Sequence, residues 1–303
     1  MVNIEKVNMN GWLNVNKPSG ISSSDVVNKV KKKLGFKKRI GHLGTLDPLA
    51  TGVLPIALGE ATKTINYISY KKKKYSFEIK WGIKTETGDE EGMVINEAKK
   101  IPDKKALEEC IKKNFLGKIR QTPPKYSAVK IRGVRAYTLA RKNIDFKIEP
   151  KEIEIYNFII KSFEKKGITS FEVLCSPGTY IRSLANDLAE KLGTYGHTLS
   201  INRLSDSFFK IGNAVPLKDL LEEKEVLNEK LLPVDYVLYN LEKINIENKY
   251  SEKLKNGIMI KAEDINKIGK NTQEPILLKN RGRVVSIANL KKGYIIPCRN
   301  FNY

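Results

Sequence analysis

The sequence is poor in the residues that most often bind metals. It contains two histidines, His42 and His197, and three widely separated cysteines, Cys110, Cys175 and Cys298. An odd number of distant cysteines favours neither a disulfide framework nor a zinc site of the CxxC type. Apolar neighbours around each cysteine instead predict small buried side chains. No clustered acidic motif indicates a Mg²⁺ site, so we expect no bound metal.

Long apolar runs and a signal sequence are also missing. The longest apolar stretches fall far short of the ~20 residues that a membrane-spanning helix needs. The first six residues lack the apolar region of a signal peptide. These absences predict a cytoplasmic protein without a membrane span. A length of 303 residues suggests one large domain accompanied by a small one.

Acidic residues are scarce relative to basic ones. The chain has 55 Lys and Arg against 34 Asp and Glu, which gives a net charge of +21. Such an excess favours a polyanionic partner, either nucleic acid or an anionic membrane surface. A lysine-rich protein with well-solvated faces would have the same composition, so charge alone does not identify RNA as the partner.

One stretch, residues 41–55, combines a single carboxylate with residues that constrain the backbone. Its sequence is Gly-His-Leu-Gly-Thr-Leu-Asp-Pro-Leu-Ala-Thr-Gly-Val-Leu-Pro, with Asp47 as the acid and His42 near the start. Glycines allow a close approach to a ligand or a positive φ, and Asp-Pro fixes the local turn. The loop is therefore suited to presenting Asp47. Because an isolated Asp-Pro pair is usually only a turn, the argument for function depends on the whole string.

This string resembles the catalytic motif of the TruB family of tRNA pseudouridine synthases. Further segments follow in the order found in that family: Lys-x-Tyr ending at Tyr75, an acidic turn at 85–92, Pro-Pro-x-Tyr-Ser-Ala at 123–128 and Gly-Thr-Tyr-Ile-Arg at 178–182. A last match at 201–204 is distinctive only in its Arg-Leu end. The resemblance covers roughly residues 10–235.

The resemblance implies an α+β pseudouridine synthase fold, with a central, largely antiparallel mixed sheet flanked by helices and loops. It assigns residues 1–240 to the catalytic domain, with an RNA-embracing insertion at 121–150. It assigns residues 245–303 to a small β-rich module that is similar to a PUA domain. Local patterns agree, because residues 75–83 alternate between apolar and polar side chains and short β runs precede the C-terminus.

Two helices near the motifs can be predicted from the residues. The first is capped by Ser23 or Ser24 and ends at Gly35. The second begins after residues 176–179 and ends at Gly193. Arg182 lies in the first turn of the second helix, away from its apolar stripe, so the helical pattern alone predicts an exposed arginine.

The resemblance implies isomerisation of one uridine, position 55 in the T-loop of tRNA, to pseudouridine. The base leaves C1′ through N1, rotates and rejoins through C5. Nothing is oxidised and no group is donated, so the reaction needs no cofactor. Asp47 would either attack C1′ as a nucleophile or remove a proton from the ribose. The sequence leaves both routes open.

The same resemblance assigns roles to other residues. Arg182 would pair with Asp47, and Tyr75 would stack on the target base. Tyr75 is also a candidate for moving the C5 proton, although a tyrosine with a pKa near ~10 is a poor base unless its pKa is perturbed. The candidates for substrate or RNA contacts are His42, Lys63, Tyr180, Arg203, Lys130, Arg132 and Arg135. His42 would occupy the space of the flipped base or stack on its neighbour, whereas His197 is predicted to be structural.

Two other functions agree with parts of the sequence. A non-catalytic RNA-binding protein of the same fold, such as a ribosome-assembly factor, would explain the charge but not the set of Asp47, Tyr75 and Arg182. A synthase directed to ribosomal RNA by a guide RNA is disfavoured by the dense 121–150 insertion and the short C-terminal part. We therefore expect a monomer that binds the T-stem-loop of tRNA.

Overall fold

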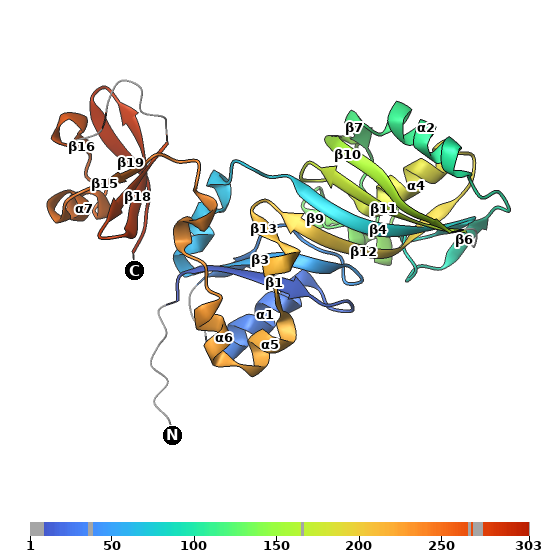
Figure 1. The fold of residues 1–303 in the computed structure, drawn as a ribbon, viewed down its shortest axis with the longest axis horizontal. Helices are drawn as coiled ribbons and strands as arrows, with labels where there is room; N and C mark the ends of the chain where they lie inside the picture. Colours follow the sequence, from blue (N-terminus) through green and yellow to red (C-terminus); the bar gives the residue numbers. More distant parts are fainter. Residues whose placement is uncertain (1–8, 36–38, 165–166, 266–267, 269–274, 303) are drawn as a thin grey trace.

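Two main β-sheets organise the chain (Figure 1). The computed structural model describes residues 9–35, 39–164, 167–265, 268 and 275–302. Within them, the larger sheet has ten strands: β1 (Gly11–Lys17), β2 (Ile40–His42), β3 (Thr51–Leu58), β4 (Lys73–Trp81), β7 (Gly117–Gln121), β10 (Lys151–Glu164), β11 (Ile168–Cys175), β12 (Gly196–Asp206), β13 (Phe209–Lys210) and β14 (Val215–Pro216). Their order is β14-β1-β3-β12-β4-β11-β10-β7, with β2 paired to β3 and β13 paired to β12.

Most neighbouring strands of the large sheet run antiparallel. The parallel pairs are β1 with β14 and β3 with β12, whereas β4 pairs antiparallel with both β11 and β12. On β4, Tyr75, Phe77, Ile79 and Trp81 are buried, as the two-residue period predicted. The expected largely antiparallel mixed sheet is therefore confirmed.

Most α-helices bury apolar side chains in the same hydrophobic cluster as this sheet, whereas Leu254 of the last α-helix lies in the cluster of the smaller sheet. The α-helices are α1 (Ser23–Leu34), α2 (Lys104–Asn114), α3 (Ala136–Arg141), α4 (Ile181–Lys191), α5 (Leu217–Glu222), α6 (Lys224–Glu229) and α7 (Asn248–Lys255). The 3₁₀ helices are η1 (Gly59–Tyr67), η2 (Ile211–Asn213), η3 (Val234–Val237) and η4 (Ala262–Asp264). Gly35 ends α1 in the left-handed region with φ 58°, as predicted. No helix in the described ranges is long and apolar enough to cross a membrane.

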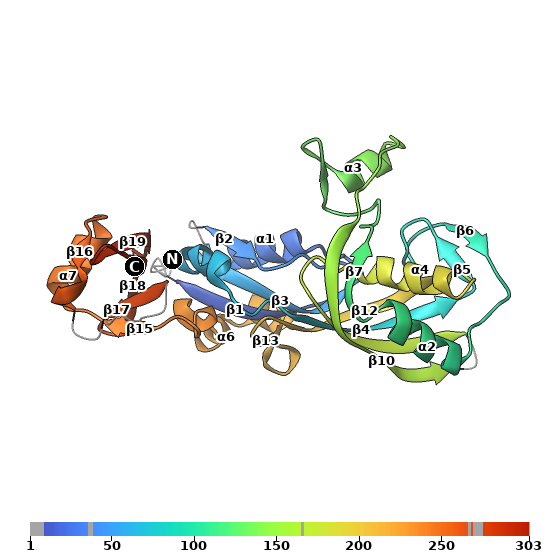
Figure 2. The same ribbon diagram turned by 90° about the horizontal axis from the view of Figure 1, so that it is seen from above.

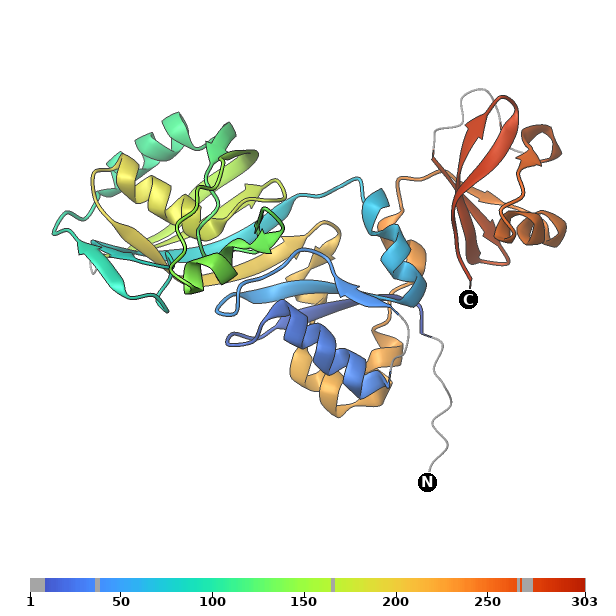
Figure 3. The same cartoon turned by 180° about the vertical axis from the view of Figure 1, so that it is seen from behind.

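Residues 130–141 form a small unit that stands out from the sheet (Figure 2). Strands β8 (Lys130–Ile131) and β9 (Val134–Arg135) pair as a hairpin that leads into α3. This unit lies inside the insertion predicted at 121–150. A second hairpin, β5 (Ile83–Thr85) with β6 (Val94–Glu97), follows β4. The view from behind shows α3 on the same side of the large sheet as α1 and α4 (Figure 3).

The C-terminal part forms the smaller sheet. Its five described strands are β15 (Lys243–Asn245), β16 (Ile260–Lys261), β17 (Ile276–Asn280), β18 (Arg283–Lys291) and β19 (Tyr294–Asn300). The β-rich character expected here is confirmed. Leu277 and Phe301 share a hydrophobic cluster with Trp12 and Val53 of the large sheet, so the boundary at 240–245 stays a prediction. Cys298 is exposed, and its predicted burial is wrong; the other two cysteines are buried.

The carboxyl group of Asp187 on α4 should make stability depend on pH. Burial and the nearby charge of Glu190 raise its pKa to about 6. The folded protein therefore binds this proton more tightly than the unfolded chain, and the resulting stabilisation is lost as the pH rises from ~4 through about 6. Asp187→Asn should raise the melting temperature at pH 8 by roughly 2–6 °C and change it little at pH 4.

Thermal melts at the two pH values test this expectation. Asp264→Asn, which replaces an exposed aspartate, is the matched control and should have no pH-dependent effect. Equal shifts for Asp187→Asn at both pH values would show that this carboxyl group does not titrate as stated.

Candidate active site

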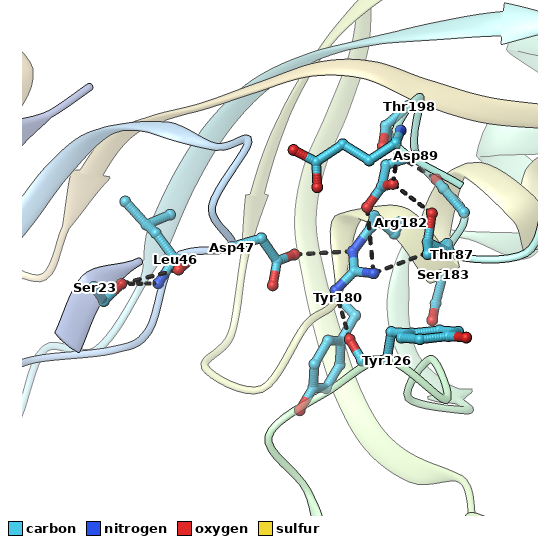
Figure 4. A network of polar contacts seen from close by, with 12 residues as sticks. Ser23, Leu46, Asp47, Thr87, Asp89, Tyr126, Tyr180, Arg182, Ser183 and Thr198 are labelled. Carbon is cyan, nitrogen blue, oxygen red and sulfur yellow. Dashed lines mark hydrogen bonds and ion pairs between the residues drawn. The ribbon is translucent and has the colours of Figure 1, made fainter. Parts of the chain in front are cut away.

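The loop between β2 and β3 that carries Asp47 is bonded to the start of α1. The hydroxyl of Ser23 accepts the Leu46 N–H at 2.8 Å and donates to the Leu46 carbonyl at 2.9 Å (Figure 4). Ser22 provides the side-chain cap of α1, so the predicted cap at Ser23 or Ser24 is wrong. Because Ser22 caps the helix, the Ser23 side chain is available to fix the backbone next to Asp47.

Lys17 supports the loop on the other side of Asp47. This side chain is 0% exposed, and its ammonium donates to the carbonyls of Pro18, Ile21 and Pro48 at 2.9, 2.7 and 3.0 Å. Burial lowers the pKa of Lys17 to about 8, against the opposing effect of the Asp47 charge. Sequence reasoning missed Lys17, because a lysine at the end of a strand is ordinarily solvated.

Arg182 reaches Asp47 from the first turn of α4. Its Nε donates to Asp47 Oδ2 at 2.9 Å, and its Nη1 and Nη2 donate to the carbonyls of Thr87 and Tyr126, both at 2.9 Å (Figure 4). Asp89 Oδ2 lies 3.4 Å from Nη1. Arg182 is only 4% exposed, so the exposure predicted from the helical pattern is wrong. The pairing with Asp47 that the resemblance implied is present.

The acidic turn supplies the second carboxylate of this network. Asp89 is 3% exposed and accepts bonds from the Thr87 hydroxyl and the Glu91 N–H. Arg182 therefore lies between a buried carboxylate and Asp47, whose side chain is 34% exposed. The sequence pattern identified the turn at 85–92 but not this function of Asp89.

Asp47 lines a cavity of about 450 Å³. The wall is formed by the Asp47 loop, β4, β12, the insertion and the segment before α4, including Gly44, Lys73, Tyr75, Ser127, Val129, Tyr180 and Ile201. Pockets of this size hold small organic ligands. Tyr75 is almost fully buried, and burial raises the pKa of its phenol well above the ordinary value. The phenol therefore stays protonated near pH 7, which disfavours Tyr75 as a base and is compatible with stacking.

Two other predicted residues lie at or near this cavity. Tyr180 lines it, and the backbone of Tyr180 is fixed by the Gln121 side chain through bonds of 2.8 and 3.1 Å. His42 ends β2 and does not appear in the cavity lining. Burial and the charges of Arg203 and Lys73 lower the pKa of His42 below 6.5, so its imidazole is neutral at pH 7.

Lys63 lies elsewhere in the molecule. From η1 its ammonium donates to Glu60 Oε2 at 2.6 Å and to the Asn300 carbonyl of β19 at 2.8 Å. The structure therefore places Lys63 at the junction between the two sheets and outside the cavity lining. The predicted contact of Lys63 with substrate or RNA stays a prediction. His197, expected to be structural, is buried and lies 3.0 Å from the Ile83 carbonyl through Nδ1.

Arg203 is fully buried beside the Asp47 loop, and its predicted contact with substrate or RNA stays a prediction. Its Nε donates to the Val53 carbonyl at 2.7 Å and its Nη2 to the Gly44 carbonyl at 2.9 Å. Arg203 therefore fixes the start of the Asp47 loop from inside the protein. The other predicted cations, Lys130, Arg132 and Arg135, are exposed on the insertion and do not line the cavity.

Sequence reasoning also missed an ion pair in the cavity wall. Lys73 Nζ lies 2.9 Å from Asp206 Oδ2, and Arg203 Nη1 lies 3.3 Å from the same oxygen. The antiparallel register of β4 and β12 creates this cluster by pairing Lys73 with Asp206 and Tyr75 with Arg203. Four consecutive lysines at 71–74 gave no signal that one of them is largely buried.

Comparison with known proteins agrees with this site. The family model described as TruB family pseudouridylate synthase (N terminal domain) matches residues 31–181. The tRNA pseudouridine synthase B of Clostridium kluyveri is 44% identical over 256 residues, which cover 84% of this chain and 86% of that protein. The protein of the same name from Anaplasma marginale is 39% identical over 300 residues, covering 96% and 97%.

Solved structures match the fold over nearly the whole chain. An H/ACA ribonucleoprotein bound to a substrate RNA has a TM-score of 0.69 at 20% identity, covering 97% of this chain and 85% of the other. A Cbf5-Nop10-Gar1 complex has a TM-score of 0.68 at 23% identity, covering 96% and 84%. These likenesses confirm the predicted pseudouridine synthase fold. The sequence identities extend over most of both chains, and we conclude that this chain belongs to the TruB family of pseudouridylate synthases.

Proposed function

We propose that this protein isomerises the uridine at position 55, in the T-loop of tRNA, to pseudouridine. The observation that carries the proposal is the 2.9 Å bond from Arg182 to Asp47 in a cavity of about 450 Å³. Relatives named tRNA pseudouridine synthase B support tRNA as the substrate. The net charge of +21 suits a polyanion of this kind.

Asp47 can begin the reaction in either of two ways. Arg182 binds Oδ2, and the other carboxylate oxygen is turned away from the guanidinium (Figure 4). Both routes need an ionised carboxylate, and the guanidinium gives it a charged hydrogen-bond donor. The free oxygen would then attack C1′ or remove a proton from the ribose. After the C1′–N1 bond breaks, the base rotates and C5 bonds to C1′.

Other residues would hold the extruded nucleotide. We assign Tyr75 to stacking on the target base and Tyr180, which lines the same cavity, to a further contact with it. The neutral imidazole of His42 would stack where the base has left its loop; stacking contributes ~1–3 kcal/mol per base. Extrusion itself costs about a few kcal/mol, so contacts of this size can offset it.

We also propose that the C-terminal module is a PUA-like RNA-binding appendage and that the protein acts as a monomer without a cofactor. Support for the module comes from its small β-rich sheet and its exposed cations, which include Lys253, Arg281 and Arg283. Its charge would add phosphate contacts to those of the catalytic part.

Tritium release tests the proposed function directly. A T-stem-loop RNA that carries uridine labelled at C5 should release one tritium per target site when incubated with this protein alone. The same RNA with cytidine at the target position, labelled at its other uridines, should release none. Tight binding without release would favour the non-catalytic RNA-binding protein, and release that requires a guide RNA would favour the guided synthase.

The insertion should contribute phosphate contacts. Lys130 and Arg132 are exposed on its β8–β9 hairpin. Replacing both by alanine should weaken T-stem-loop binding and reduce the slope of log K against log salt concentration by roughly 0.7–0.9 per lost contact. Binding isotherms at several salt concentrations measure this slope. Lys112→Ala/Lys113→Ala removes the same charge from the exposed end of α2 and should leave the slope unchanged. Equal slopes for both double variants would show that the insertion does not contact RNA phosphates.

A further inference from the structure

The cavity wall beside Tyr75 carries an excess positive charge. Lys73 and Arg203 approach the same oxygen, Asp206 Oδ2, at 2.9 and 3.3 Å. The side chains are 13%, 0% and 1% exposed for the lysine, the arginine and the aspartate. Two cationic side chains therefore share one carboxylate in a region that is almost inaccessible to solvent. The remaining charge favours an electron-rich group nearby.

The two cations differ in how their N–H donors are used. Arg203 also donates to the carbonyls of Val53 and Gly44. An ammonium has three donors, and within the described residues Asp206 is the acceptor that Lys73 Nζ contacts. A largely buried donor without an acceptor is costly. Lys73 lines the cavity, so a bound molecule can supply the missing acceptor there.

Lys73 is also placed beside the groups that would react. Residues two apart on a strand point to the same face, so Lys73 and Tyr75 face the cavity together. A methyl group added at Gly44 would overlap Lys73 Nζ. Gly44 precedes Asp47 by three positions, so the ammonium packs directly against the loop that carries the acid.

We propose that Lys73 is a further catalytic residue, which donates a hydrogen bond to a carbonyl oxygen of the target uracil and stabilises the negative charge of the departing base. This inference rests on the proposed function. The leaving base is the group that becomes anionic during the reaction. The excess positive charge of the Lys73–Asp206–Arg203 cluster would stabilise that anion.

The step balances as follows for either role of Asp47. When the C1′–N1 bond breaks, its electron pair goes to the base, where N1, O2 and O4 share it. C1′ then either bonds to the Asp47 carboxylate or forms a double bond to C2′ after C2′ loses a proton to that carboxylate. C5 of the base then attacks C1′ with this electron pair. On the first route the Asp47–C1′ bond breaks, and on the second C2′ takes its proton back from Asp47, so the carboxylate is regenerated on both. C5 finally loses its proton and N1 gains one. A fixed donor in a nearly dry site stabilises such an anion without reorganisation.

Lys73→Met tests the proposal, with Lys74→Met as its matched control. Lys74 is the next residue on β4 but pairs with Glu172 at 2.7 Å on the opposite face. Lys73→Met should slow single-turnover pseudouridine formation by about 10²–10³-fold, the usual cost of losing one such donor. Binding of the T-stem-loop should change little, and Lys74→Met should react at the wild-type rate. Asp206 keeps Arg203 as a partner, so the variant should fold.

Thio-substituted substrates identify the contact itself. The target uridine is replaced by 2-thiouridine or 4-thiouridine, because sulfur is a weak hydrogen-bond acceptor. In wild type, one of the two should react more slowly than uridine; in Lys73→Met that extra loss should disappear. Each thio effect is a ratio of the rates of one enzyme on two substrates. A smaller fraction of folded enzyme lowers both rates equally and leaves the ratio unchanged.

Three outcomes are distinguishable by nucleoside analysis of the digested RNA. A thio effect that vanishes in Lys73→Met supports the contact. Thio effects of equal size in both enzymes, or a Lys73→Met rate within about 3-fold of wild type, overturn it. A wild-type protein that does not convert plain uridine overturns the proposed function instead.

Discussion

Replacing Asp47 by asparagine is expected to abolish pseudouridine formation while RNA binding survives. The amide has nearly the same shape and can still accept the bond from Arg182 Nε, now 2.9 Å long. It can neither attack C1′ nor take a proton from the ribose, so turnover should fall by roughly 10⁴-fold or more. Tritium release under single-turnover conditions gives the rate, and a binding isotherm for the same RNA gives the affinity.

A matched control makes this result specific. Asp145→Asn removes a carboxylate that is 96% exposed and pairs only loosely with Lys125 at 3.4 Å. That variant should react at the wild-type rate. If Asp47→Asn retained activity within about 10-fold of wild type, the carboxylate would have no part in the chemistry. Loss of both binding and activity would instead mean that Asp47 shapes the loop.

Replacing Arg182 by methionine is expected to damage both catalysis and stability. The guanidinium is 4% exposed and has two carboxylates, Asp47 and Asp89, and two carbonyls as partners. Removing it leaves Asp89 buried without its counter-ion, a change that costs about 3 kcal/mol or more. The melting temperature should fall by roughly 6–12 °C. Turnover should fall by about 10³-fold or more, because Asp47 loses its charged donor.

A double variant separates the two effects. In Arg182→Met/Asp89→Asn the buried carboxylate without a counter-ion is removed, so most of the lost stability should return. Activity should stay low, because Asp47 still lacks its partner. Thermal melts and single-turnover rates on the three proteins measure both quantities. Recovery of activity together with stability would show that Arg182 acts only through the fold. A wild-type rate for Arg182→Met would show that Arg182 has no part in catalysis.

The sequence indicated the fold through its resemblance to the TruB family, while local patterns predicted single elements and the loop that presents the acid. The alternation from Tyr75 predicted a half-buried strand, and β4 is that strand. The spacing of glycines and prolines around Asp47 indicated a loop built to present a carboxylate, and the structure has this loop between β2 and β3. These features are local, since strand periodicity and turn chemistry depend on residues a few positions apart.

The partners of these residues were decided by the tertiary structure. Ser23 bonds the Asp47 loop instead of capping α1, Lys63 lies at the junction of the two sheets, and Arg203 is buried. A local pattern tells which side of an element a residue occupies but not what packs across from it.

The contacts of Arg182 and Lys73 show the physical reason most clearly. Arg182 looks exposed on a helical wheel, yet it meets Asp47, 135 positions away, because α4 packs against the loop and the acidic turn. Lys73 meets Asp206 because β4 and β12 pair in one register. Strand register and helix docking minimise the exposed apolar surface of the whole chain, so only the complete fold determines which charges come together in the cavity wall.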